Sequence, residues 1–145
     1  VAGKMDNRVI AAYQQLGFKL VVDPSVNYSG YFDARSRSIT MKQIDDSVYH
    51  ELGHFLAFIA GNVDKTASFQ SIFAAEKANV TAFNKAYVTQ NASEYFAESV
   101  KDYILNNASL KSTRPQTYAA VQNALNQITD AQIAKIQKIY GAFWN

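Results

Sequence analysis

The chain contains only two histidines, and they stand four residues apart in the segment His50-Glu51-Leu52-Gly53-His54. Residues at this spacing lie on one face of an α-helix, about 5–6 Å apart at Cβ. The apolar residues around the segment also repeat at helical intervals: Val48, Leu52, Phe55, Leu56 and Ile59. Asp45 or Asp46 can cap the start of such a helix, and Gly61 can end it. The segment therefore predicts a helix that presents both imidazoles side by side.

This arrangement is typical of a metal site. Two imidazoles four residues apart can both bind one Zn²⁺ at about 2.0–2.1 Å. Glu51 follows His50 directly, so its carboxylate can reach a water molecule on the metal without binding the metal itself. The competing interpretation is an ordinary helix whose histidines have only a structural role. Because both histidines of the chain fall in the motif, we predict that His50 and His54 bind Zn²⁺ and that Glu51 is a general base.

A catalytic zinc ion usually has three protein ligands and one open position. The chain has no cysteine and no third histidine, so the third ligand must be a carboxylate. The downstream candidates are Asp64, Glu76, Glu94, Glu98, Asp102 and Asp130. We expect Asp64 to stand too near the motif in sequence to fold back onto it, and Glu76 fits a solvated helix face equally well.

Glu94 and Glu98 stand four residues apart on a predicted helix and therefore share a face. One of them can bind the metal while the other accepts the free ring N–H of a ligand histidine and orients it. The alternative is a solvated acidic pair, relieved by Lys101 three residues beyond Glu98. Residue type and spacing leave both roles open to either carboxylate.

The composition indicates a globular domain and excludes several classes of protein. A length of 145 residues suits one domain, residues 1–145, and 48% apolar residues suffice for a core. The formal net charge is +2 and the basic residues are scattered, so we expect no nucleic-acid partner. The longest apolar run, residues 54–60, is far short of the roughly 20 residues that span a membrane. The absence of cysteine excludes disulfides and a thiol nucleophile.

The predicted elements form a small sheet followed by helices. A helix that ends at Gly17 precedes three strands, at residues 18–22, 31–32 and 38–41. Beyond the motif helix, we predict helices over residues 69–78, from 91–93 to 104, from Pro115 to 125 and from 129 to 140, the last ended by Gly141. This order predicts an α+β fold with a mostly helical C-terminal lobe. The strand at 38–41 has two interpretations that the sequence supports equally: an edge strand with which an extended peptide can pair, or an ordinary strand of the sheet.

The motif together with the segment Asn91-Ala92-Ser93-Glu94-Tyr95-Phe96-Ala97-Glu98 resembles the catalytic domain of anthrax lethal factor and the secreted Pro-Pro endopeptidases of the same clan. The resemblance covers roughly residues 28–128. It implies that Glu94 is the third zinc ligand and that Glu98 orients a ligand histidine, which we take to be His50. It also implies that Tyr87 points into the site, where its hydroxyl would stabilise an oxyanion. A packing role for Tyr87 is the alternative.

The resemblance implies a secreted zinc endopeptidase of the gluzincin type that cuts a protein or peptide substrate, with proline-directed cleavage left open. We expect a monomer. The chain begins at Val1 without a leader, which we interpret as a processed piece of a longer protein. Residues 61–68 and 79–92 flank the motif helices and are expected to form the rim of the site. The competing hypothesis is a non-catalytic or toxin-like binding module that keeps the fold.

Overall fold

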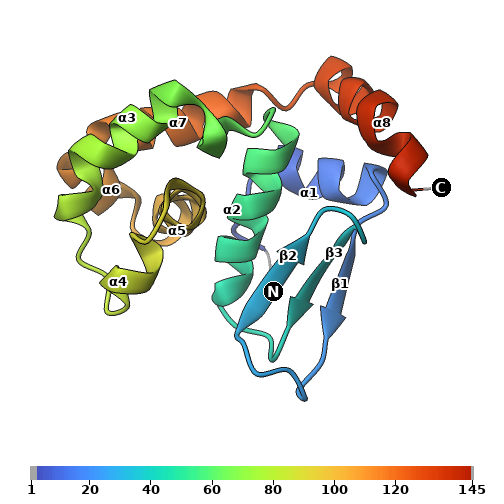
Figure 1. Cartoon of the computed structure of the whole chain (residues 1–145), viewed down its shortest axis with the longest axis horizontal. Coiled ribbons are helices and arrows are strands. Elements are labelled where there is room, and N and C mark those ends of the chain that lie inside the picture. Colours follow the sequence, from blue (N-terminus) through green and yellow to red (C-terminus); the bar gives the residue numbers. More distant parts are fainter. Residues whose placement is uncertain (1–2, 145) are drawn as a thin grey trace.

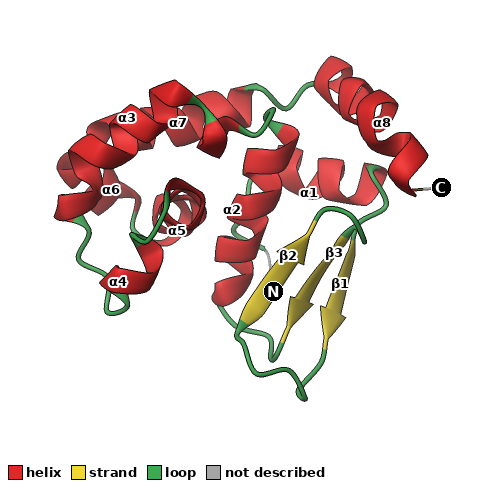
Figure 2. Cartoon of the chain, in the orientation of Figure 1, coloured by secondary structure: helices red, strands yellow, loops and turns green. Residues whose placement is uncertain are grey.

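The computed structural model describes residues 3–144 and has an α+β fold (Figure 1, Figure 2). Its N-terminal third contains α1 (Asn7–Gln15) and three strands, β1 (Lys19–Val22), β2 (Gly30–Asp33) and β3 (Ser38–Met41). The elements that follow are α2 (Ser47–Ile59), η1 (Val63–Lys65), α3 (Ala67–Glu76), η2 (Lys77–Asn79), α4 (Lys85–Val88), α5 (Ala92–Leu105), α6 (Asn107–Thr113), α7 (Pro115–Asn126) and α8 (Asp130–Trp144). The predicted fold class, a small sheet followed by a helical lobe, is confirmed.

The three strands form one sheet in the order β1-β3-β2. β1 runs parallel to β3, whereas β2 runs antiparallel to β3. Of the two interpretations of residues 38–41, the edge strand is therefore wrong and the ordinary strand is confirmed, because β3 is central and β2 is the edge nearest α2 (Figure 1). Burial explains this order: Ile39 and Met41 of β3 are almost fully buried, whereas all four residues of β1 are exposed.

α2 is the central helix of the molecule. It packs on β2 and β3 on one side and on α5 on the other (Figure 1). Eleven of its 13 residues are buried. Glycine at position 53 permits the contact with α5, because a Cβ added there would lie 2.6 Å from the carbonyl oxygen of Ala97. This close approach brings one face of α5 within side-chain reach of the two histidines.

Three helices differ from the prediction: α8 in its C-terminal end, and the short helices α4 and α6 because no helix was predicted there. α8 continues past Gly141 to Trp144, because Trp144 packs 5.8 Å from the ring of Phe18 and donates its Nε1–H to the carbonyl of Ala34 at 3.0 Å. α6 was not predicted, since Leu110 is its one buried residue and no apolar repeat marks it. No helix within residues 3–144 has the length and apolar character needed to cross a membrane.

Glu76 is buried rather than part of a solvated helix face. Its carboxylate accepts the backbone N–H groups of Gln116 and Thr117 at 3.0 and 2.7 Å, and the hydroxyl of Thr117 at 2.7 Å. The first N–H groups of a helix have no partner within it. Glu76 of α3 therefore accepts the hydrogen bonds of the N–H groups that have no partner within the first turn of α7.

Candidate metal centre

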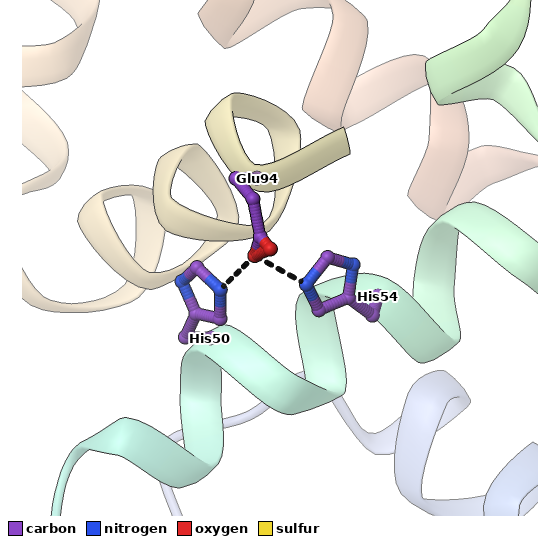
Figure 3. Close-up of side chains that lie close together, drawn as sticks. All are labelled: His50, His54 and Glu94. Atoms are coloured by element: carbon purple, nitrogen blue, oxygen red, sulfur yellow. Dashed lines mark hydrogen bonds and ion pairs between the residues drawn. The ribbon is translucent and has the colours of Figure 1, made fainter. Parts of the chain in front are cut away.

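The middle of α2 and the first turn of α5 bring three predicted residues together (Figure 3). His50 Nε2 and His54 Nε2 lie 3.0 and 2.9 Å from the same oxygen, Oε1 of Glu94. Ligand atoms of these three residues all lie within 4.8 Å of one another. Among the described residues 3–144, no other group of metal-ligating side chains converges in this way.

Glu94 is held in place by the start of its own helix. Asn91 is the N-cap of α5, and its side chain accepts the backbone N–H of Glu94 at 2.8 Å. Ser93 donates its hydroxyl to the buried carboxylate of Asp64 at 2.7 Å, which ties the same turn to η1. Helix capping and helix packing thus place the Glu94 carboxylate opposite both imidazoles.

The three donors fit a zinc ion. Two imidazole nitrogens and one carboxylate oxygen are ligands that Zn²⁺ takes in catalytic sites, with a fourth position left open. Ligand atoms of a tetrahedral ion with bonds of about 2.0–2.1 Å lie roughly 3.3 Å from one another. The nitrogen–oxygen distances of 2.9 and 3.0 Å are close to that spacing, and all three ligand atoms lie within 4.8 Å of one another.

Glu98 lies one turn beyond Glu94 on α5 and contacts the other nitrogen of one ring. His50 Nδ1 donates to Glu98 Oε1 at 2.8 Å. A carboxylate in this position fixes the tautomer and orientation of a ligand histidine. Lys101 Nζ lies 3.9 Å from Glu98, so the acid also has a cationic neighbour. Glu98 therefore has the contact with His50 that its expected orienting role requires.

The charges of this cluster depend on one another. Burial by itself lowers the pKa of His50, but hydrogen bonds to Glu94 and Glu98 outweigh burial and raise that pKa to about 9. Burial raises the pKa of Glu94, yet the two imidazoles hold it well below its usual range. Metal binding requires neutral imidazoles. A divalent cation between these groups would therefore replace the imidazole protons as the partner of the carboxylate.

Glu51 lies beside the three donors and is not one of them. Its side chain is buried, and burial raises the pKa of the carboxyl while His50 and His54 oppose the rise. Glu51 lines two adjacent hollows of about 370 and 190 Å³. This position suits a group that exchanges protons with a molecule in the site.

Tyr87, on α4, lines the same two hollows. Its ring centroid lies 6.3 Å from that of His50. Burial, followed by the charges of Glu94 and Glu51, raises the pKa of the phenol, which therefore keeps its proton and can donate it in a hydrogen bond. Because 53% of the residue is exposed, Tyr87 is not a core residue. Its catalytic role stays a prediction.

The two hollows meet at three residues that border both: Gly30, Glu51 and Tyr87. Of the two segments expected at the rim, 79–92 supplies Asn84 and Tyr87, whereas 61–68 supplies no residue to either hollow. The sequence alone did not identify Gly30 as a site residue. Gly30 stands directly before the strand predicted at 31–32, and a strand prediction one residue longer could have pointed to it, since a glycine inside a strand often marks a close approach.

The other acidic candidates have structural partners or face solvent. Asp102 accepts from the Arg114 guanidinium at 2.6 Å. Asp64 accepts from Ser93 at the start of α5 and lies outside the metal-ligating group, as its nearness to the motif in sequence led us to expect. Asp130 begins α8 and is exposed. Of the six candidate carboxylates, only Glu94 contacts both histidines.

Comparison with known protein families identifies the family of this chain. The family model described as "Anthrax toxin lethal factor, N- and C-terminal domain" matches residues 19–124, which is most of the chain. The chain belongs to this family. The part of this chain that matches the lethal factor family model includes α2 and α5 in full. It therefore includes every residue of the metal-ligating group.

A curated relative is the Pro-Pro endopeptidase of Clostridioides difficile (strain 630). It is 41% identical over 78 residues, which cover 51% of this chain and 34% of the relative. The chain thus matches a minor part of that protein's length. The resemblance to lethal factor and to Pro-Pro endopeptidases is confirmed, and the chain is related to proteases.

Proposed function

We propose that this chain is a zinc-dependent endopeptidase of the gluzincin type, in which His50, His54 and Glu94 hold the ion. The convergence of these donors from two helices carries the proposal. A structural zinc site is closed by four protein ligands. The donor group within residues 3–144 has three, and membership of a protease-related family supports a catalytic use of the fourth position.

When bound, Zn²⁺ would supply a Lewis acid that polarises the scissile carbonyl and makes water more acidic. Glu51 takes a proton from the attacking water and later delivers it to the leaving amine. A carboxyl whose pKa is raised by burial retains the proton more readily between these two steps. The Tyr87 hydroxyl donates to the developing oxyanion. Glu98 holds the His50 ring in its orientation.

The substrate chain runs along β2 in this proposal. β2 is an edge strand, and an extended peptide can add to such an edge through its backbone hydrogen bonds. The two hollows beside Glu51 would then receive side chains of the peptide. Cleavage next to proline is the first specificity to test, because the relative is named a Pro-Pro endopeptidase. Secretion and a monomeric state stay predictions.

Two measurements on the purified protein test this function. Elemental analysis of protein never exposed to chelator should find about one zinc per chain. A peptide library that includes proline pairs should be cleaved by the wild type and not by Glu51→Gln, which should keep its zinc. Protein without zinc contradicts the metal site. Protein with zinc that cleaves no peptide supports instead a non-catalytic binding module with the same fold.

A further inference from the structure

Glu51 lies against the backbone of β2 at Gly30. A Cβ added to Gly30 would stand 2.9 Å from Cγ of Glu51 and 3.1 Å from its Oε2. Non-bonded carbon atoms pack at about 3.5–4.0 Å. The same Cβ would lie 2.9 Å from Sδ of Met41 on the neighbouring strand. Any side chain at position 30 must therefore displace Glu51, Met41 or the strand itself.

The backbone gives no other reason for glycine at this position. Gly30 lies in a strand opposite Met41 and does not have the positive φ of Gly17 and Gly61. Glycine within a strand weakens it and often marks a point where another group approaches closely. Here the group that approaches from α2 is the side chain of Glu51.

Gly30 also occupies a special place in the site, since it borders both hollows together with Glu51 and Tyr87. A peptide that follows β2 from one hollow to the other must pass this point. Glu51 reaches the same point from α2 because position 30 carries no side chain.

We propose that Gly30 is a positioning residue for Glu51. By lacking a side chain, it lets the Glu51 carboxylate stand against β2 at the junction of the two hollows. The catalytic consequence rests on the proposed function, whereas the contact between positions 30 and 51 can be tested independently of it.

The catalytic arm compares Gly30→Ala with two control substitutions. Gly30→Ala should lower kcat about 10–100-fold, because a displacement near 1 Å costs a catalytic group about that much. KM should stay within about threefold and zinc content should not change. Gly3→Ala and Gly141→Ala should behave as wild type, since a Cβ at either position meets nothing within 4 Å.

The outcomes of this arm separate the two proposals. If Gly30→Ala keeps full kcat while Glu51→Gln is inactive, the positioning role is wrong and the proposed function stands. If Glu51→Gln cleaves as well as wild type, the proposed function is wrong instead.

The second arm uses thermal unfolding and needs no activity. Gly30→Ala should lower Tm in the wild-type background and lower it less in a Glu51→Ala background, where the contacts with Cγ and Oε2 of Glu51 are gone and only the contact with Met41 remains. The double variant should therefore fold even if Gly30→Ala alone does not. Met41→Val tests the other contact. The inference would be overturned if Gly30→Ala lowered Tm as much in the Glu51→Ala background as in wild type, and did not lower it in a Met41→Val background.

Discussion

At the scale of single residues, two carboxylates of one helix face have different partners. Glu94 contacts Nε2 of both histidines, whereas Glu98 contacts only Nδ1 of His50. The atom of the imidazole that a carboxylate meets thus separates a candidate ligand from an orienting group. Removal of the Glu94 carboxylate and removal of the Glu98 carboxylate should therefore have different effects on zinc binding.

Glu94→Ala should abolish zinc binding, because two imidazoles alone leave the ion without its third protein ligand. Glu98→Ala should keep the ion with about 10–100-fold weaker affinity, the usual effect of losing an orienting partner. Titration against a competing zinc chelator measures both. Asp130→Ala, which removes an exposed acid, is the control and should bind as wild type. If Glu98→Ala instead abolishes zinc binding and Glu94→Ala only weakens it, the third ligand is Glu98, one helical turn further along α5.

Tyr87→Phe removes one hydroxyl from the site and keeps the ring. If the phenol donates to the oxyanion, kcat should fall about 10²–10³-fold with little change in KM. Steady-state kinetics on one good peptide measure this, with zinc content determined in parallel. Tyr118→Phe, on α7 and outside both hollows, should leave kcat unchanged. Wild-type kinetics for Tyr87→Phe would leave the residue with a binding or packing role.

At the scale of elements, the contact of α2 with α5 depends on Gly53. An added Cβ would lie 2.6 Å from the carbonyl oxygen and 2.8 Å from Cα of Ala97. Both are backbone atoms, so a rotamer change cannot relieve the contact. Since the two helices carry the two halves of the metal-ligating group, their separation governs both stability and zinc binding.

Gly53→Ala should therefore destabilise the fold by about 1–3 kcal/mol, as overpacking of a core does, and should also weaken zinc binding. Urea unfolding and the chelator titration measure the two effects. Gly141→Ala in α8 is the matched helical control, and a Cβ there meets nothing within 4 Å. It should be neutral or stabilising by up to about 1 kcal/mol, because alanine favours helix. Equal stability of the two variants would contradict the tight helix contact.

Glu76 provides a second test at this scale, at the junction of α3 and α7. Glu76→Ala leaves the buried N–H of Thr117 and the partly buried N–H of Gln116 without their acceptor and should cost about 1–3 kcal/mol. Glu76→Gln keeps one acceptor oxygen and should cost less. Neither should change zinc content, since Glu76 lies outside the metal-ligating group. Loss of zinc in Glu76→Ala would instead favour Glu76 as the ligand.

At the scale of the whole molecule, the candidate metal centre joins two packed units. α2 belongs to the layer on the sheet, and α5 packs on α6 and α7 of the helical lobe (Figure 1). An ion held by residues of both helices binds the folded state and not the unfolded chain, and so stabilises the fold as a whole.

Removal of zinc should therefore lower Tm. At a free zinc concentration about 100 times Kd, the ion contributes about 2.7 kcal/mol. For a domain of this size that corresponds to a change in Tm of roughly 5–10 °C. Calorimetry with and without chelator measures the shift, and returned zinc should restore it. Glu94→Ala is the control and should show no zinc-dependent shift. A similar shift in that variant would place the stabilising ion elsewhere.

The sequence by itself determined what depends on near neighbours along the chain. The spacing of His50 and His54 placed both rings on one helix face, because helical periodicity is a local property. The absence of cysteine and of a third histidine restricted the third ligand to carboxylates. The order of strand and helix patterns indicated an α+β fold, and the Asn91 to Glu98 segment indicated the family. Helix ends at Gly17 and Gly61 followed from their left-handed backbone preference.

Only the tertiary structure decided which distant groups meet. The central place of β3, the capping of α7 by Glu76 and the contact of Glu51 with Gly30 all join segments far apart in sequence. The approach of α5 to α2 at Gly53 brings the Glu94 carboxylate to both histidines. Such contacts follow from how the whole core packs against itself, and neither residue type nor local spacing specifies that packing.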